Sequence, residues 1–457
     1  MKEYDAIFIG AGQAGPFLAA RMAAMGRKVV LIERKFLGGT CVNAGCMPTK
    51  TLVASAKTAQ VARRASEFGV RIDGEPVVDM KAVAARARKV TLDARSGLAS
   101  WFDSLETMDV VYGHARFVGA KVVSVGGSLY TAPQIFINVG ARPHIPDVPG
   151  LANVPYLTST SVIALEELPK HLVVLGGSYI GLEFAQMYRR FDAQVTVIER
   201  GQYLASREDE DISQAIADIL TRDGIKVLLS HKIVSVTTDS AEITVRTDQG
   251  DVRGSHVLVA VGRQPNTDDL GLDQAGVETD RRGYITVDER LQTNVEGIWA
   301  LGDCNGRGAF THTSYNDFEI AAANLLDGSD RKVSDRILGY GLYIDPPLGR
   351  VGMTESQARA SGRSLLVAKR PMSRVGRAVE KAETLGFMKL VADAETREIL
   401  GAAILGTSGD EAISGVLDLM NAGATIDTLR WAVPIHPTVA ELLPTLALDA
   451  KPDGGAS

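Results

Sequence analysis

The sequence predicts an α/β protein in which one strand–turn–helix–strand unit occurs twice and a smaller α+β domain follows. Two glycine-rich turns predict the repeated unit, because each follows a short apolar strand and precedes an apolar stretch of helical length. β-rich segments with alternating apolar and polar residues follow both units. From about Ser334 onward, a different succession of strand and helix patterns predicts the third domain. The repeated units are therefore expected to be Rossmann-like dinucleotide-binding domains.

The first unit begins with the strand YDAIFI and the turn GAGQAG. Gly10 permits the tight turn, Gly12 lets a pyrophosphate approach the backbone, and Gly15 lets helix and strand pack closely. The next strand, KVVLIE, ends in Glu33, an acid placed to hydrogen-bond a ribose hydroxyl. The N-terminus of the intervening helix would face the phosphates. The unit therefore predicts a dinucleotide site.

The second unit, within HLVVLGGSYIGLEF and QVTVIER, repeats this arrangement with Gly176, Gly181 and Glu199. The first glycine and the terminal acid are 23 residues apart in both units. Ser178 replaces the middle glycine, which is compatible with a close approach if its φ is negative. Each β-rich segment also ends in an apolar strand followed by a Gly-x-x-Pro sequence, and the second of these begins at Gly262. The repetition indicates an internal duplication and two bound dinucleotides.

The bulk composition excludes several classes of protein. The 457 residues carry a net charge of -6 with no long basic run, which argues against nucleic acid and anionic membranes as partners. No apolar run reaches the roughly 18 residues of a membrane span. Three cysteines cannot form the disulfide framework of a secreted protein. A cytoplasmic protein with two or three domains is expected.

The stretch GGTCVNAGCMPTK contains Cys41 and Cys46, which could bind zinc, lie inert in the interior or carry out redox chemistry. Structural zinc sites need further cysteines or histidines nearby. The nearest other cysteine is Cys304, and no histidine lies within 60 residues. Redox chemistry is therefore favoured, no metal site is expected, and Cys304 is interpreted as a packed core thiol.

Taken together, five motifs in order resemble the FAD-dependent pyridine nucleotide–disulfide oxidoreductases of class I, which include dihydrolipoyl dehydrogenase, glutathione reductase and mercuric reductase. The motifs are the first glycine-rich turn with its acid, GGTCVNAGCMPTK, GGSYIGLE, TNVEGIWALGDC and HPTVAE. The resemblance covers essentially the whole chain. It implies that a nicotinamide reduces FAD, that FAD reduces a Cys–Cys disulfide, and that the dithiol reduces a substrate.

The resemblance assigns distinct roles to the two cysteines. Cys41 corresponds to the thiol that attacks the substrate, and Cys46 to the thiol next to the flavin. Because Met47-Pro48-Thr49 predicts the start of a helix, Cys46 would lie at a helix N-terminus, where the pKa of a thiol falls. Gly38 and Gly39 would let the backbone pass close to the flavin.

Further site residues follow from the same resemblance. Lys50 and Glu183 match a pair beside the reactive edge of the flavin, and Tyr179 matches a residue that covers the nicotinamide pocket. Asp303 matches the acid that binds the ribityl chain of FAD. The remaining assignments are two cofactor contacts and an acid–base dyad that the family takes from the partner subunit: Thr40, Gly262, His436 and Glu441.

We expect three domains, a homodimer and a preference for NADH. Residues 1–145 and 264–335 form the FAD-binding domain, residues 146–263 bind NAD(P)H, and residues 336–457 form the interface of a homodimer. Glu199 favours NADH, because its charge repels a 2′-phosphate, although Arg200 and Arg207 could pair with that phosphate.

The substrate is left open among several sulfur compounds. Dihydrolipoyl dehydrogenase is the leading activity, with a lipoyl-bearing protein as a possible partner. A mercuric reductase-like enzyme, or a reductase of glutathione disulfide or hypothiocyanous acid, is the alternative, and a flavin-carrying interaction protein is the non-enzymatic one. No cysteine follows Cys304, so delivery of Hg(II) by C-terminal thiols is not expected.

Overall fold

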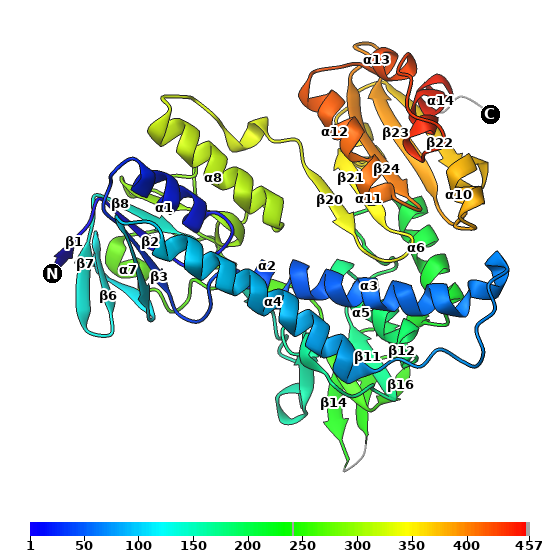
Figure 1. Ribbon diagram of the computed structural model, residues 1–457, viewed down its shortest axis with the longest axis horizontal. Helices are drawn as coiled ribbons and strands as arrows, with labels where there is room; N and C mark the ends of the chain where they lie inside the picture. The colour runs from blue at the N-terminus through cyan, green and yellow to red at the C-terminus, as the bar shows by residue number, and fades with distance from the viewer. Residues whose placement is uncertain (240–241, 454–457) are drawn as a thin grey trace.

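Three large sheets organise the chain in the computed structural model, which describes residues 1–239 and 242–453 (Figure 1). The first sheet has the strand order β19-β8-β2-β3-β4, and all its neighbouring strands are parallel. Its strands are β2 (Ala6–Ile9), β3 (Val29–Glu33), β4 (Met108–Tyr112), β8 (Gln134–Ile137) and β19 (Ile298–Ala300). Strand β19 returns to this sheet after the whole second unit has been completed. The first unit is therefore built from two separate stretches of chain.

The second sheet is also parallel, with the order β10-β17-β11-β12-β13. Its strands are β10 (Tyr156–Thr158), β11 (His171–Leu175), β12 (Gln194–Ile198), β13 (Lys226–Leu228) and β17 (His256–Val259). Parallel strands connected through helices are the arrangement that the duplicated unit predicts.

The third sheet is antiparallel and belongs to the C-terminal domain, which lies above α3 and α6 in Figure 1. In sheet order its strands are β20 (Gly339–Leu342), β21 (Leu348–Gly352), β24 (Ile399–Leu405), β23 (Phe387–Asp393), β22 (Leu365–Pro371) and β25 (Lys451–Pro452). Strands β23 and β24 are buried at every residue, because helices and the second unit cover their two faces.

The remaining strands form three small sheets. They are β1 (Lys2–Glu3), β7 (Ser128–Thr131), β6 (Val122–Val125) and β5 (Ala115–Gly119); β14 (Ile233–Thr238), β15 (Ile243–Thr247) and β16 (Gly250–Gly254); and β18 (Arg263–Pro265) with β9 (Ala141–Pro143). The β-rich segments are thus antiparallel only in part. Their final strands, β8 and β17, join the parallel sheets, since the apolar sequences QIFI and HVLV suit a strand covered on both faces.

The helices lie between and around these sheets. In chain order they are α1 (Gly15–Ala24), α2 (Gly39–Ala44), α3 (Cys46–Arg63), α4 (Met80–Asp103), α5 (Tyr179–Arg190), α6 (Glu210–Arg222), α7 (Leu272–Ala275), α8 (Thr311–Leu326), α9 (Glu355–Ala360), α10 (Gly376–Glu380), α11 (Gly409–Ala412), α12 (Ser414–Asn421), α13 (Ile426–Arg430) and α14 (Leu443–Leu448). Helices α3 and α4 pack together and run from the first unit to the second (Figure 1). Among the described residues, no helix is both long and apolar enough to cross a membrane.

The two glycine-rich turns adopt the predicted backbone. Gly10 has φ 96° and Gly176 has φ 105°, values that side chains other than glycine rarely adopt. A Cβ atom on Gly10 would lie 2.4 Å from the carbonyl oxygen of Asn138. Ser178 has φ -103°, so the negative φ on which a close approach depends is present in the second turn.

Asn138 fastens the first turn to the rest of its domain. It follows β8, is only 3% exposed, and accepts a hydrogen bond from the backbone N–H of Gly15 at 3.0 Å. Its Nδ2 donates to the carbonyl oxygen of Leu301 at 2.8 Å. A Cβ atom on Gly12 would lie 2.7 Å from its Oδ1, so this glycine also makes room for Asn138. One buried amide therefore joins β8, the start of α1 and the strand end after β19.

We expect Asn138→Ala to lower the free energy of unfolding by about 2–3 kcal/mol, because it leaves buried backbone groups without partners. Urea denaturation of the purified protein measures the effect. Asn421→Ala is the matched control, since its amide donates to Leu417 at the surface. Equal behaviour of the two variants would contradict the role of Asn138.

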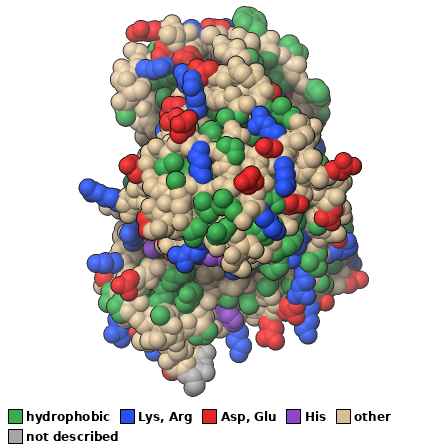
Figure 2. Space-filling model, turned by 90° about the vertical axis from the view of Figure 1, so that its left-hand side faces the viewer, with side chains coloured by type: hydrophobic (Ala, Val, Ile, Leu, Met, Phe, Trp, Pro, Cys, Tyr) green, Lys and Arg blue, Asp and Glu red, His purple; other side chains and the backbone are tan. Residues whose placement is uncertain are grey.

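Neither sign of charge dominates an extended area of the face drawn in Figure 2. Lys and Arg side chains are interspersed there with Asp and Glu. This mixture agrees with the small net charge of -6.

Candidate active site

The cysteine stretch folds into two helices, of which the sequence predicted only the second. Cys41 lies within α2, and Cys46 is the first residue of α3. Gly45 separates them, and a Cβ atom at this position would lie 2.8 Å from the carbonyl oxygen of Thr40. The tight break brings the two thiols together despite four intervening residues. The prediction that Cys46 begins a helix agrees with the structure.

The surroundings of the two thiols shift their pKa values in opposite directions. A hydrogen bond from Cys41, a further one with Thr311 and the charge of Lys50 lower the pKa of Cys46 to about 6, against the opposing effect of burial. Its Sγ lies 3.1 Å from the Oγ1 of Thr311. Donation to Cys46, together with burial, raises the pKa of Cys41 well above its ordinary range. In the dithiol state Cys46 is therefore the thiolate and Cys41 the protonated donor.

Lys50 lies one helical turn after Cys46 and pairs with the second unit. Its Nζ is 2.7 Å from the Oε2 of Glu183, which lies on α5 and is buried. The other carboxylate oxygen, Oε1, accepts a hydrogen bond from the backbone N–H of Tyr343 at 3.0 Å. The ammonium also lies over the ring of Tyr343, 4.4 Å from its centroid. One cation next to the thiols thus contacts both the second unit and the C-terminal domain.

Tyr179 is the first residue of α5 and lies one turn before Glu183. Its hydroxyl donates to the Oε1 of Glu208 at 2.8 Å. At Gly181, a Cβ atom would lie 2.3 Å from the carbonyl oxygen of Gly176, which explains the close packing of the turn against the helix.

The residues around the first turn fit a dinucleotide. A cavity of about 300 Å³ is open beside the turn between α1, α2 and α4, and its walls include Gly12, Gln13, Gly38 and Met47. Gly39 has φ 59°, and a Cβ atom there would lie 2.8 Å from the Cα of Gly12. The absence of a side chain at Gly39 therefore lets the cysteine stretch pack directly against the first glycine-rich turn.

Asp303, Thr40 and Gly262, which the sequence predicts as cofactor contacts, have different surroundings. Burial raises the pKa of the Asp303 carboxyl, although Arg263 lies 3.3 Å away and opposes the shift. Thr40 is exposed on α2. Gly262 has φ 140°, and a Cβ atom there would meet nothing within 4 Å, so open space borders its Cα.

Glu33 is the last residue of β3, and Glu199 directly follows β12. Each carboxylate accepts backbone hydrogen bonds at the glycine-rich turn of its own unit. Glu33 accepts hydrogen bonds from the backbone N–H groups of Ala11 at 2.9 Å and Lys35 at 2.7 Å. Glu199 accepts from those of Gly177 and Gly201, both at 2.7 Å. These bonds fix a negative charge beside each glycine-rich turn.

His436 and Glu441 form a pair on the C-terminal domain. The Nδ1 of His436 lies 2.7 Å from the Oε2 of Glu441, and the histidine side chain is 81% exposed. The apolar side chains of Trp431, Val433 and Ile435 are exposed in the same segment. The two residues predicted as a dyad are therefore in contact within one chain, in a segment that exposes large apolar side chains.

Cys304 is fully buried in the short 3₁₀ turn after β19. Its Sγ lies 3.3 Å from the carbonyl oxygen of Leu301, and burial raises its pKa to about 12. These surroundings agree with the expected packed thiol.

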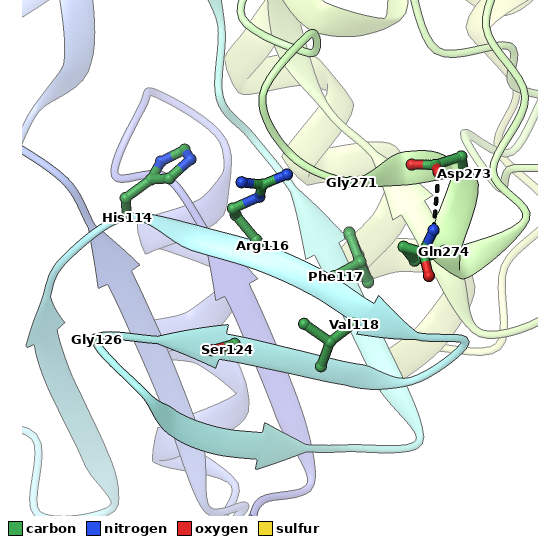
Figure 3. Close-up of a pocket in the computed structure, with 9 residues that line it drawn as sticks. All are labelled: His114, Arg116, Phe117, Val118, Ser124, Gly126, Gly271, Asp273 and Gln274. Carbon is green, nitrogen blue, oxygen red and sulfur yellow. Dashed lines mark hydrogen bonds between the residues drawn. The ribbon is translucent and has the colours of Figure 1, made fainter.

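A cavity of about 500 Å³ lies apart from the thiols, between β5, β6 and α7 (Figure 3). Its walls include Arg116, Ser124, Asp273 and Gln274, and Asp273 accepts a hydrogen bond from Gln274. None of the predicted site residues lines it. The described residues also contain no group of three or more His, Cys, Asp or Glu that could hold a metal ion.

Sequence reasoning missed Thr311, Tyr343, Glu208 and Asn138. Each of them contacts a predicted residue from a distant part of the chain. No local pattern distinguishes these four from other polar or aromatic residues.

Residues 4–317 match the pyridine nucleotide-disulphide oxidoreductase family, and residues 340–447 match the dimerisation domain of the same family. The chain belongs to this family. As a member it is an FAD-dependent oxidoreductase that uses a pyridine nucleotide, and the predicted fold class is confirmed.

Several relatives are similar over nearly the full chain. The probable pyridine nucleotide-disulfide oxidoreductase RclA of Escherichia coli is 35% identical, covering 97% of this chain and 98% of RclA. A mercuric reductase of Streptomyces lividans is 35% identical over 96% and 94% of the two chains. A dihydrolipoyl dehydrogenase of Thermus scotoductus is 33% identical over 96% of each.

A solved structure of Escherichia coli RclA, described as an HOCl-induced flavoprotein disulfide reductase in complex with Cu(II), superimposes with a TM-score of 0.91. It covers 98% of this chain and 99% of the other, at 35% identity.

We expect Thr311→Val to raise the pKa of Cys46 by about one unit, because the variant removes a hydrogen bond to the charged form. In the reduced wild-type protein, alkylation of Cys46 by iodoacetamide should fall as the pH drops through about 6, since protonation removes the nucleophilic thiolate. Peptide mass spectrometry measures the rate at each pH. The exposed Thr58 of α3, whose hydroxyl donates only to the carbonyl of Ala54, supplies the control Thr58→Val. An unchanged pH profile in Thr311→Val would contradict the assignment.

Proposed function

We propose that the protein is an NAD(P)H-dependent reductase of small oxidised sulfur compounds and that Cys41 and Cys46 are its redox pair. The observation that carries the proposal is that the pKa of Cys46 is lowered while the pKa of Cys41 is raised. A stabilised thiolate next to a protonated partner is the arrangement that thiol–disulfide exchange requires. The division of the chain into domains at residues 145, 263 and 335 is proposed with it.

When bound, FAD would supply the transfer of two electrons from the nicotinamide to the Cys41–Cys46 disulfide. We infer that Cys41, once deprotonated, attacks a sulfur of the substrate, and that Cys46 then attacks Cys41 and restores the disulfide. For a disulfide substrate the balance is RSSR + NADH + H⁺ → 2 RSH + NAD⁺. For hypothiocyanous acid it is HOSCN + NADH → SCN⁻ + NAD⁺ + H₂O. Lys50, held by Glu183, is proposed to lie beside the flavin and to favour negative charge there.

His436 is proposed to move the proton of Cys41 in the partner subunit, with Glu441 orienting its ring. Two observations support a shared site: the histidine is 81% exposed in the single chain, and its segment exposes large apolar side chains. A second copy of the chain would cover both. The match to the family's dimerisation domain agrees with this homodimer.

The choice of a small sulfur oxidant rests on the similarity to RclA, which is described as an HOCl-induced disulfide reductase. Dihydrolipoyl dehydrogenase activity is the second candidate. It is supported by the His436–Glu441 pair and by relatives of that name. A lipoyl-bearing protein would then be the partner.

A substrate panel tests this proposal. We expect NADH-dependent turnover of glutathione disulfide or hypothiocyanous acid to exceed reduction of Hg(II) and to exceed NAD⁺-dependent oxidation of dihydrolipoamide. We also expect His436→Ala to slow turnover of the sulfur substrate about 100-fold, because a general acid–base group is lost. Reduction of a quinone by the same variant should change less than about twofold, since electrons can reach a quinone without the thiols.

Two outcomes would contradict the proposal. Faster oxidation of dihydrolipoamide would favour the second candidate. Equal losses with the sulfur substrate and the quinone would show that His436 is structural.

We expect kcat/KM to be higher with NADH than with NADPH, because the carboxylate of Glu199 is held beside the second turn and repels a 2′-phosphate. Steady-state kinetics with both nucleotides measures this preference, and Arg200→Ala should increase it by removing an exposed cation. A preference for NADPH would contradict the prediction. Its persistence in Arg200→Ala would also exclude Arg200 as the cause.

A further inference from the structure

The start of α8 is in contact with the first two residues of β20 in the C-terminal domain. The ring of Phe310, the residue before α8, stacks on the ring of Tyr340, with centroids 5.4 Å apart and planes 9° from parallel. The Nε2 of His312 lies 2.6 Å from the carbonyl oxygen of Gly339 and donates to it, because a carbonyl oxygen can only accept. The residues on both sides of Thr311 are therefore held by the C-terminal sheet.

Thr311 connects this contact to the thiols. It is the first residue of α8, and its Oγ1 lies 3.1 Å from the Sγ of Cys46. The backbone N–H of Phe310 donates to the Oγ1 of Thr313 at 3.1 Å, and its carbonyl oxygen accepts from the backbone N–H of Ser314 at 3.0 Å. Because these bonds fix Phe310 to the first turn of α8, a shift of its ring would move the hydroxyl of Thr311 as well.

The ring of Tyr340 has an anchor that does not involve α8. Its hydroxyl donates to the Oε1 of Glu208 at 2.8 Å, and the Oε2 of this carboxylate accepts from the Nε of Arg350 at 3.0 Å. The side chains of Glu208 and Arg350 are 0% and 1% exposed. A buried ion pair thus fixes the ring on which Phe310 stacks.

We propose that Tyr340 is a positioning residue that holds Phe310 and thereby keeps the hydroxyl of Thr311 against Cys46. The inference rests on the proposed function only in taking Cys46 as the functional thiolate. A hydrogen bond weakens steeply outside its normal distance and angle, so a small displacement of the helix start reduces the stabilisation of the thiolate. The C-terminal domain would in this way act on a thiol of the first unit.

A second contact of α8 limits the effect to its first turn. The Nε of Arg336 donates to the Oδ1 of Asn316 at 2.7 Å, and its Nη2 pairs with Asp317. Both partners lie more than one turn after Thr311. Loss of the stack on Tyr340 therefore loosens the start of the helix while the rest stays docked.

Replacement of Tyr340 removes no charge from the site. Burial and the neighbouring Glu208 raise the pKa of Tyr340 to about 12, so its hydroxyl is neutral where Cys46 titrates. The titratable groups that face Cys46 or flank Thr311 all remain in the variants below; they are Cys41 on α2, Lys50 on α3, His312 on α8 and Tyr343 after β20. A shifted titration of Cys46 would thus report a change of geometry.

The pH dependence of Cys46 alkylation by iodoacetamide in the reduced protein tests the inference, with peptide mass spectrometry as the readout. We expect Tyr340→Leu to raise the midpoint by about half a unit to one unit, because the bond from Thr311 is weakened. Tyr340→Phe is the matched control. It loses the same bond to Glu208 but keeps the stacked ring, so its midpoint should move by less than about 0.2 units.

Two further variants separate positioning from a general loss of structure. Phe310→Leu removes the other ring of the stack and should shift the midpoint as Tyr340→Leu does. In the Thr311→Val background, Tyr340→Leu should add no further shift, because the hydroxyl through which it acts is already absent. A residue that served only to stabilise the fold would not show this dependence on Thr311.

Three results would overturn the inference: unchanged midpoints in Tyr340→Leu and Phe310→Leu, equal shifts in Tyr340→Phe and Tyr340→Leu, or a full additional shift by Tyr340→Leu in the Thr311→Val background. Phe310→Leu decides the question if Tyr340→Leu does not fold. Alkylation uses no sulfur substrate, so a wrong substrate assignment leaves the test intact. A wild-type protein in which Cys46 does not titrate near 6 would instead contradict the thiolate of the proposed function, and the inference with it.

Discussion

The ion pair between Lys50 and Glu183 is the contact on which the site depends. Helix α3 begins at Cys46 in the first unit, and α5 begins at the glycine-rich turn of the second. The 2.7 Å contact joins these helices one turn from each N-terminus. It therefore sets the position of the thiols relative to the second turn. The pair is partly exposed on the lysine side, so its importance lies in geometry more than in stability.

The contact between the second unit and the C-terminal domain contains several buried charged side chains. Arg350 meets Glu208, and Lys389 lies 2.7 Å from both Asp211 and Glu355. Buried ion pairs contribute little net stability, because desolvation offsets most of their attraction. Their directional hydrogen bonds do select one orientation of the two surfaces. An apolar contact of the same size would allow the surfaces to slide, and Tyr179 would lose its fixed partner.

The pKa values of the two thiols depend both on the local sequence and on residues far away along the chain. The position of Cys46 at a helix N-terminus follows from the local sequence around Pro48. The hydrogen bond from Thr311 comes from a residue 265 positions away. The hydrogen bond from Cys41 lowers the pKa of Cys46 most, and the bond from Thr311 and the charge of Lys50 lower it further. Neither the local nor the distant part alone accounts for the difference between Cys41 and Cys46.

The sequence by itself determined the repeated parallel units, the two glycine-rich turns and the cysteine pair, because these depend on local periodicity and on the special backbone of glycine. Family resemblance added the pairs Lys50–Glu183 and His436–Glu441. Only the tertiary structure decided that Asn138 fastens the first turn, that α2 is helical, and that Glu208 lies behind Tyr179. These contacts join segments more than 25 residues apart or depend on packing around a short helix. Hydrophobic periodicity specifies which face of an element is buried, but the neighbour that a polar side chain meets there is set by how the whole domains pack.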